Sequence, residues 1–121
     1  MRSPLALLGD KGERLAARQV RREGGRLVAR NWKTRQGELD LVVLDGGTLA
    51  FVEVKSRKSD EYGTPGEMIP RAKRRRIEKL AQYFLRRRRL DPPLLRFDVV
   101  EVLWTEPPAV RWIRNAWLAG E

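Results

Sequence analysis

Residues 37–55 read G-E-L-D-L-V-V-L-D-G-G-T-L-A-F-V-E-V-K, which is the pattern of a β-hairpin. Two apolar-rich runs, 39–44 and 49–54, flank the segment D-G-G-T, whose glycines tolerate the positive φ of a tight turn. A turn that is symmetric about the two glycines places Val42 opposite Phe51. The pattern therefore predicts the hairpin together with its register.

That register brings four charged side chains together. It places Asp40 opposite Glu53 and Glu38 opposite Lys55. Because side chains alternate between the two faces of a strand, all four are expected on one face, at the open end of the hairpin. The other face is expected to be wholly apolar, with Leu39, Leu41, Val43, Ala50, Val52 and Val54.

These charges need a counter-charge. Carboxylates that face each other on paired strands have Cβ atoms roughly 5 Å apart, and like charges so placed destabilise a sheet. Lys55 supplies one positive charge against three carboxylates, so a divalent cation, Mg²⁺ or Mn²⁺, is the predicted partner, since hard cations prefer oxygen ligands. The alternative interpretation is a surface cluster of ion pairs on a half-buried hairpin.

A carboxylate-held metal suits the hydrolysis of phosphodiester bonds, because it activates a water and relieves charge on the leaving oxygen. In this hypothesis Asp40 and Glu53 are the metal ligands, and Lys55 offsets the charge of the transition state. Glu38 or Glu13 is then available for a second ion or an ordered water.

The composition narrows the chemistry further. The chain has 121 residues, with 26 Lys and Arg against 16 Asp and Glu, and its net charge of +10 favours a polyanionic partner. Nucleic acid leads, DNA ahead of RNA. An anionic membrane surface is the rival, but no basic helix carries the broad exposed aromatic face of a membrane-surface helix. The absence of cysteine and histidine excludes thiolate zinc sites, disulfides, a cysteine nucleophile and the usual catalytic base.

The length suits a single domain over residues 1–121. No apolar run is long enough to span a bilayer, and the first residues lack a convincing signal-peptide cleavage site. We therefore expect a cytoplasmic protein without membrane contact.

A helix is expected over residues 11–23, after a loose end formed by residues 1–8. Asp10 is a suitable N-cap, and Glu13 follows three residues later, as in a capping box. Glu13 also shares the apolar face of this helix, which should meet the sheet. Two interpretations of Glu13, as a cap and as a site residue, stay open.

The remaining elements follow in order. Strands are expected at 26–32, 95–104 and 110–114, a helix at 71–89, and an exposed loop at 56–70. The first strand and the hairpin should form an antiparallel meander. The order α-β-β-β-α-β, with one further C-terminal strand, predicts an α/β fold with a mixed sheet flanked by helices.

The helix at 71–89 has the clearest periodicity in the chain. Its apolar stripe should pack on the sheet and consists of Ile77, Leu80, Ala81, Phe84 and Leu85. Lys73 lies one turn before this stripe on the same side, so it is predicted to reach the carboxylates.

Asp40 with the later segment E-V-K at 53–55, in this order of elements, resembles the PD-(D/E)xK nuclease superfamily, which has the restriction-endonuclease-like fold. Nearly the whole chain also resembles the YraN-type family of predicted endonucleases, through short motifs in the same order. These are G-D-K-G-E from Gly9, R-N-W from Arg30, G-E-L-D from Gly37, F-V-E-V-K-S-R from Phe51, G-T-P from Gly63, K-R-R-R-I from Lys73, R-F-D-V-V from Arg96 and I-R-N-A-W from Ile113.

The resemblance implies a metal-dependent active site at Glu13, Asp40, Glu53 and Lys55, with the first three as metal ligands. The family is similar to archaeal Hjc-type Holliday junction resolvases, which share a Glu on the N-terminal helix, a strand Asp and an E-x-K. Because those enzymes cut two strands symmetrically, a homodimer is an open alternative for this chain. Leu39 stands where the superfamily name has Pro, although the G-E-L-D pattern of the YraN-type family is kept.

We therefore expect a Mg²⁺- or Mn²⁺-dependent DNA endonuclease, selective for branched, flapped or single-stranded DNA because no base-reading motif is evident. Two alternatives remain, a non-catalytic nucleic-acid-binding protein derived from a nuclease fold and an RNA-directed homologue. The residues expected to face the nucleic acid flank the proposed site, and they are Arg30, Lys33, Arg35, Arg57, Lys58, Lys73 and Arg74.

Overall fold

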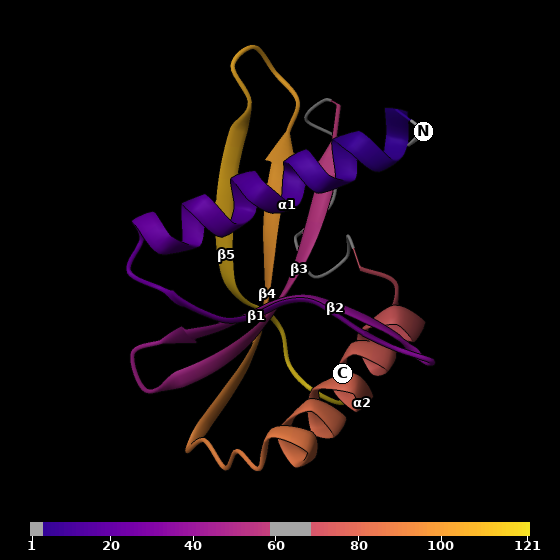
Figure 1. Ribbon diagram of the computed structural model, residues 1–121, viewed down its shortest axis with the longest axis vertical. Coiled ribbons are helices and arrows are strands. Elements are labelled where there is room, and N and C mark those ends of the chain that lie inside the picture. The colour runs from indigo at the N-terminus through magenta and orange to yellow at the C-terminus, as the bar shows by residue number, and fades with distance from the viewer. Residues whose placement is uncertain (1–3, 59–68) are drawn as a thin grey trace.

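The chain folds into one five-stranded sheet with a helix on each face (Figure 1). The computed structural model describes residues 4–58 and 69–121, with side chains from Leu8 onward. The elements follow in the order α1 (Pro4–Arg22), β1 (Arg26–Thr34), β2 (Gly37–Asp45), β3 (Thr48–Arg57), α2 (Arg71–Arg88), β4 (Leu94–Leu103) and β5 (Ala109–Trp117). The strands lie side by side in chain order, and only β3 and β4 are parallel. The predicted α-β-β-β-α-β order with a further C-terminal strand is confirmed.

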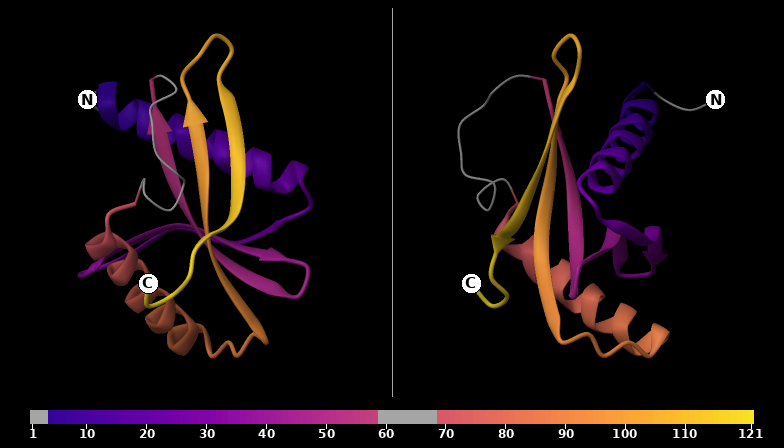
Figure 2. Two further views of the ribbon diagram at one scale, coloured as in Figure 1. Left: turned by 180° about the vertical axis from the view of Figure 1, so that it is seen from behind. Right: turned by 90° about the vertical axis from the view of Figure 1, so that its left-hand side faces the viewer.

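The two helices each cover an apolar face of the sheet. On one face, Ala16 and Val20 of α1 pack with Leu41 and Val52, and Trp112 closes the same cluster. On the other face, the predicted stripe of α2 is buried against the aromatic side chains of β3 and β4. Figure 2 shows α1 crossing the long strands β3 to β5, with α2 beside the β1–β2 hairpin. Both faces of the sheet are therefore occupied by a helix and an apolar cluster.

Helix α1 begins earlier than predicted. It starts at Pro4, so the prediction that Asp10 caps a helix from residue 11 is wrong, and Asp10 lies inside the helix. The physical reason is that proline suits the first turn of a helix and that the following L-A-L-L segment consists of strong helix formers. Glu13 therefore lies in the helix interior, which excludes its interpretation as a capping residue. Residues 1–3 lie outside the described residues.

The helix ends where the sequence predicts. Gly24 has a φ of 97°, in the left-handed region that glycine tolerates. Gly25 lies close to the sheet, because a Cβ there would lie 2.7 Å from Cγ1 of Val43. The two glycines thus stop α1 and let the chain pass directly into β1.

The predicted hairpin register is confirmed from the turn as far as Leu41, whereas the predicted pairs of Asp40 with Glu53 and of Glu38 with Lys55 are absent from the ladder that the structure describes between β2 and β3. Val42 lies opposite Phe51, and the ladder between β2 and β3 runs from the pair Asp45 and Thr48 to the pair Leu41 and Val52. Beyond that last pair no backbone pairing of β2 with β3 is present among the described residues. The strands therefore separate at Asp40.

One part of the predicted face assignment is wrong. Leu39 packs in the cluster around α2, whereas Leu41 packs in the cluster around α1. The alternation of side chains between the two faces of β2 breaks between Leu39 and Leu41, at the level where Asn31 of β1 has a φ of 52°. Asn31 lies between the paired residues of the ladder of β1 with β2, opposite Asp40. The β1–β2 hairpin bends there, and Figure 1 shows it running across the direction of β3, β4 and β5.

The loop predicted at 56–70 falls largely outside the described residues, except that β3 continues to Arg57 and that Ile69 is buried under α2. β5 extends further than predicted at both ends, from Ala109 to Trp117, whereas β4 begins and ends one residue earlier than predicted. Over residues 4–58 and 69–121, neither helix is long and apolar enough to cross a membrane.

Candidate functional site

Asp40 occupies the point at which β2 leaves β3. Its Oδ2 accepts a hydrogen bond of 2.8 Å from the backbone N–H of Val54. The carboxylate therefore replaces the backbone carbonyl that would have continued the ladder, and its position is fixed by β3 itself. Asp40 is partly buried, and its neighbour Glu53 on β3 is only 7% exposed.

Two further carboxylates approach Asp40 from other elements. Oxygens of Glu13, Glu38 and Asp40 all lie within 4.8 Å of one another. Glu13 comes from α1 and is held by a hydrogen bond with the side chain of Asn31. The bend at Asn31 thus serves both to turn the hairpin and to orient a carboxylate. Four acidic side chains from three elements meet at this place, which we call the carboxylate cluster: Glu13, Glu38, Asp40 and Glu53.

The electrostatics of the carboxylate cluster are strained in the absence of a cation. Burial, the negative charge of Glu53 and a hydrogen bond that protonated Asp40 donates to Glu53 together raise the pKa of Asp40 to about 8. The Val54 N–H opposes this rise because it favours the ionised form. Burial and the charge of Glu38 likewise raise the pKa of Glu13 above its ordinary value, against the hydrogen bond from Asn31.

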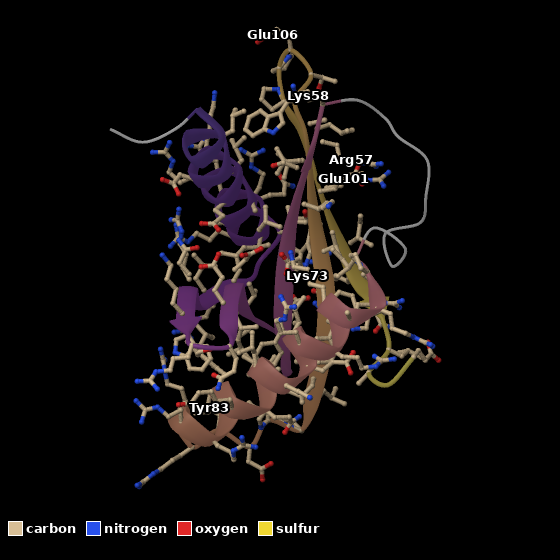
Figure 3. The ribbon with its side chains drawn as sticks, turned by 90° about the vertical axis from the view of Figure 1, so that its right-hand side faces the viewer. Arg57, Lys58, Lys73, Tyr83, Glu101 and Glu106 are labelled. Atoms are coloured by element: carbon tan, nitrogen blue, oxygen red, sulfur yellow. The ribbon has the colours of Figure 1, made fainter. Side chains whose placement is uncertain are left out.

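Two lysines lie near the carboxylate cluster, and only one of them forms an ion pair with it within the described residues. The Nζ of Lys73 lies 3.1 Å from Oε1 of Glu53, so Lys73 reaches the carboxylates from α2 as its helical position predicts (Figure 3). Its side chain remains 48% exposed. Lys55 follows two residues after Glu53 on β3 and is partly buried, and it forms no ion pair with another residue of the described ranges 4–58 and 69–121. Its ammonium group is therefore available to a ligand.

The donor set fits a hard divalent cation. Three carboxylate oxygens within 4.8 Å of one another, from a half-buried Glu13, an exposed Glu38 and a buried Asp40 side chain, are the ligand type that Mg²⁺ and Mn²⁺ prefer. The sequence predicted Asp40, Glu53 and Glu13 as the metal ligands. The three carboxylates that lie within 4.8 Å of one another are instead Glu13, Glu38 and Asp40. Glu53 joins the cluster through Asp40. The individual metal and catalytic roles of these residues stay predictions.

The residues predicted to face nucleic acid fall into two groups. Most lie at exposed or partly exposed positions around the site, and the charges of Arg30 and Lys33 act directly on Glu13. Arg57 is different, because its side chain is 9% exposed and its Nη2 lies 2.8 Å from Oε2 of Glu101 (Figure 3). We therefore remove Arg57 from the predicted contact surface. The residues retained are Arg30, Lys33, Arg35, Lys58, Lys73 and Arg74.

Two residues of this region escaped the sequence analysis. Asn31 is one, and its signal was an Asn inside a β-prone segment, since Asn adopts the left-handed conformation more readily than other non-glycine residues. Glu101 is the other, a 2% exposed side chain on β4 next to Lys55 in the parallel ladder. A charged residue at the centre of the apolar run V-V-E-V-L was its signal.

The comparisons with known proteins identify the family of this chain. A model of the family described as "Uncharacterised protein family UPF0102" matches residues 12–102, the segment from Gly12 within α1 to Val102 near the end of β4. A UPF0102 protein of Symbiobacterium thermophilum is 50% identical over 95 residues, which cover 78% of this chain and 80% of that protein. Another from Solibacter usitatus is 44% identical over 110 residues, covering 89% and 83%, and one from Nocardia farcinica is 49% identical over 107 residues, covering 84% of each. The chain belongs to the UPF0102 family, the YraN-type family.

Proposed function

We propose that this protein is a metal-dependent endonuclease that hydrolyses phosphodiester bonds in DNA. The observation that supports it most is the carboxylate cluster, in which Glu13, Glu38 and Asp40 present oxygens within 4.8 Å of one another beside a buried Glu53. Acidic groups so placed repel one another unless a cation or a proton lies between them. Clusters of this kind, with perturbed pKa values, are typical of functional sites.

The roles of the side chains follow from their positions. Glu13, Glu38 and Asp40 would hold the divalent cation, with Glu53 next to Asp40. A bound divalent cation supplies Lewis acidity towards the phosphate and activates the attacking water. The Val54 N–H and the Asn31 side chain keep two of the carboxylates in place, which limits reorganisation during the reaction.

Lys55 is the proposed catalytic cation. It shares β3 with Glu53 and is partly buried, and it lacks an ion pair within the described part of the chain. A partly buried ammonium group without an ion pair can bind a phosphate oxygen and offset the negative charge that develops in the transition state. Lys73 supplies further positive charge from α2, and it already contacts Glu53.

The proposed substrate is DNA with an unpaired or branched region. The net charge of +10 favours binding to the phosphate backbone. Direct base reading needs an element that enters a groove of the duplex, and the basic helix α2 instead packs its apolar stripe against the sheet and presents Lys and Arg side chains to solvent. Contacts to phosphates position a protein on nucleic acid without reading its sequence, which favours selectivity for structure.

The test is cleavage of branched, flapped and single-stranded DNA with Mg²⁺ or Mn²⁺. We expect cleavage by the unaltered chain, its loss in Asp40→Asn and in Lys55→Ala, and its retention in Asp91→Asn, which changes an exposed carboxylate between α2 and β4. The proposal fails if the chain cleaves none of these substrates, or if Asp40→Asn and Asp91→Asn cleave equally fast.

A second candidate function is binding of nucleic acid without cleavage. The contact between Lys73 and Glu53 favours it, since a lysine already neutralises one carboxylate of the cluster. It predicts that Asp40→Asn leaves binding unchanged and that log affinity falls by about 0.9 per phosphate contact against log salt on duplex DNA. Competition between matched RNA and DNA strands distinguishes an RNA-directed homologue from a DNA-binding one.

A further inference from the structure

A concave surface that contains none of the four carboxylates lies between the β1–β2 turn and the part of α2 from Arg76 to Arg87. Its volume is about 620 Å³, within the roughly 300–1,000 Å³ typical of ligand sites. We call it the basic groove, because six of its lining side chains are cationic: Lys33, Arg35, Arg76, Lys79, Arg86 and Arg87. No Asp or Glu of the described residues lines it.

The positive charge of the basic groove is not neutralised by the protein. Within the described ranges, none of the six cations takes part in an ion pair. Helix α2 contributes four of them, and Lys33 and Arg35 come from the end of β1 and the turn after it. A concave surface that gathers positive charge from two elements focuses its field on an anion.

The basic groove also contains two aromatic side chains. Tyr83 on α2 is 37% exposed, and its ring centroid lies 5.5 Å from that of Trp32 on β1. Trp32 is in turn fixed by an edge-on contact with the buried Phe84, at 5.2 Å. Tyr83 therefore presents an exposed ring on a rigid support, and Figure 3 shows it on the outer part of α2. An exposed ring among cations is the combination that binds unpaired bases together with their phosphates.

The basic groove leads towards the carboxylate cluster. Lys33 lines the groove and is the cross-strand partner of Glu38, and its charge acts on Glu13. β1 is an edge strand of the sheet, so no further strand separates the two sites. A chain of phosphates in the groove is thereby directed to the carboxylates around the edge of the β1–β2 hairpin.

We propose that the basic groove binds single-stranded nucleic acid, with phosphates on its Lys and Arg side chains and an unpaired base stacked on Tyr83. This inference deepens the proposed function and rests on it for the identity of the ligand as a nucleic acid. The groove selects an unpaired strand because the bases of a duplex are already stacked on one another and are not free to stack on Tyr83. It suits a lipid surface less well, since a membrane-binding face projects apolar side chains and this one is hollow.

The test is fluorescence anisotropy with a labelled oligothymidylate and an abasic strand of the same length, in EDTA so that no cleavage takes place. Tyr83→Ala should weaken oligothymidylate binding by about 5- to 150-fold, because stacking on an aromatic ring contributes about 1–3 kcal/mol per base. The same variant should bind the abasic strand within about twofold of the unaltered chain, and Tyr83→Phe should bind both strands normally.

A pair of charge variants tests the phosphate contacts. The double variant Arg35→Ala with Arg87→Ala should weaken binding to both strands and lower the slope of log affinity against log salt by about 1.4, since a single strand contributes about 0.7 per contact. Its matched control, Arg22→Ala with Arg111→Ala, removes the same charge from exposed positions on α1 and on the opposite edge strand β5, and it should leave the slope unchanged.

Several outcomes would overturn the proposal. They are an equal loss of affinity in the two charge variants, an unchanged affinity for oligothymidylate in Tyr83→Ala, and displacement of the strand by phosphatidylserine vesicles. Because binding is measured without metal, its result is separate from that of the cleavage test. Tyr83-dependent binding without cleavage supports the groove and contradicts the nuclease, whereas Asp40-dependent cleavage with normal binding by Tyr83→Ala and Arg35→Ala/Arg87→Ala does the reverse.

Discussion

Two acidic clusters of the same sheet differ in their partners: in one, hydrogen-bond donors surround the carboxylate, and in the other, carboxylates face one another. Asp98 on β4 is fully buried, and Arg96 donates to both its carboxylate oxygens at 2.8 and 2.9 Å. The indole N–H of Trp112 and the backbone N–H of Asn115 complete its hydrogen bonding, each at 2.9 Å. Asp40 has the Val54 N–H as its hydrogen-bond donor and otherwise faces other carboxylates.

The pKa values report the same contrast. Hydrogen bonds from Arg96 and Arg114 hold the pKa of Asp45, which shares Arg96 with Asp98, below its ordinary value. The pKa of Asp40 is raised to about 8 by burial and by its acidic neighbours. Arg114 links Asp45 to Glu23, so this compensated network joins the β2–β3 turn, β5 and the end of α1. A buried acid that is fully paired is costly to break, whereas an unpaired group of acids indicates a place for a ligand.

The largest expected effect concerns the compensated cluster. Asp98→Ala removes a fully buried carboxylate and leaves the partly buried guanidinium of Arg96 with Asp45 alone, and we expect it to lower the free energy of unfolding by about 3–5 kcal/mol. Urea denaturation measures this loss. Asp91→Ala, at an exposed position, should change the same quantity by less than about 0.5 kcal/mol. A small loss in Asp98→Ala would show that the network does not hold the sheet together.

The next effect concerns the carboxylate cluster, where we expect a substitution to lower activity and not stability. Asp40→Asn should reduce the rate of DNA cleavage by about 10²–10³-fold, since it removes one preorganised group from the reacting centre. The free energy of unfolding of the metal-free protein should stay the same or rise at pH 8, because a mutual repulsion is removed. A variant that loses stability as Asp98→Ala does would place Asp40 among the structural acids.

A smaller effect is expected from pH and metal together. The folded-state pKa of Asp40 is about 8, above the roughly 3.9 of an unfolded chain, so the folded protein binds the additional proton between these values. The stability that this proton contributes is fully present below about pH 4 and is lost as the pH rises through 8. Thermal unfolding in EDTA should show this decline, and Asp40→Asn should remove it.

Divalent cations should restore the stability lost at high pH. Excess Mg²⁺ or Mn²⁺ at pH 8.5 should add about 2.7 kcal/mol when the cation is present at 100 times its dissociation constant. The same addition to Asp40→Asn should have a much smaller effect. Equal stabilisation of the two proteins would indicate that the cation binds elsewhere.

The smallest effect concerns the ion pair that borders the carboxylate cluster. Lys73 is half exposed, so Lys73→Ala should change the free energy of unfolding by no more than about 1 kcal/mol, far less than the loss of the buried pair of Arg96 and Asp98. Chemical denaturation of the two variants side by side measures the difference. A loss in Lys73→Ala as large as that in Asp98→Ala would contradict the contrast between the clusters.

Much of the fold follows from local patterns in the sequence. The period-two hairpin and the turn D-G-G-T predicted the register of β2 and β3, and the apolar stripe predicted the buried side of α2. The start of α1 was missed because Asp10 is as good a cap in isolation as Pro4 is a first residue, and only the extent of the folded helix separates them.

The site could be predicted only in part. Strand register placed Asp40 beside Glu53, and helical position brought Lys73 to it. The approach of Glu13 and Glu38 depends on how α1 packs and on the bend at Asn31, and no local pattern specifies either. At the same bend Leu39 lies on the face towards α2, whereas strict alternation had predicted it on the face with Leu41. The missing information is the long-range packing of elements.

Calorimetric titration of Mn²⁺ into the metal-free protein at pH 7, in two buffers of different ionisation enthalpy, tests the central claim most directly. Because Asp40 is protonated at that pH, binding should release close to one proton, and the number should fall as the pH rises past 8. Asp40→Asn should abolish the binding, while Asp91→Asn should keep it. An absence of binding, or equal binding by the Asp40→Asn variant and the unaltered chain, would contradict a metal site at the carboxylate cluster.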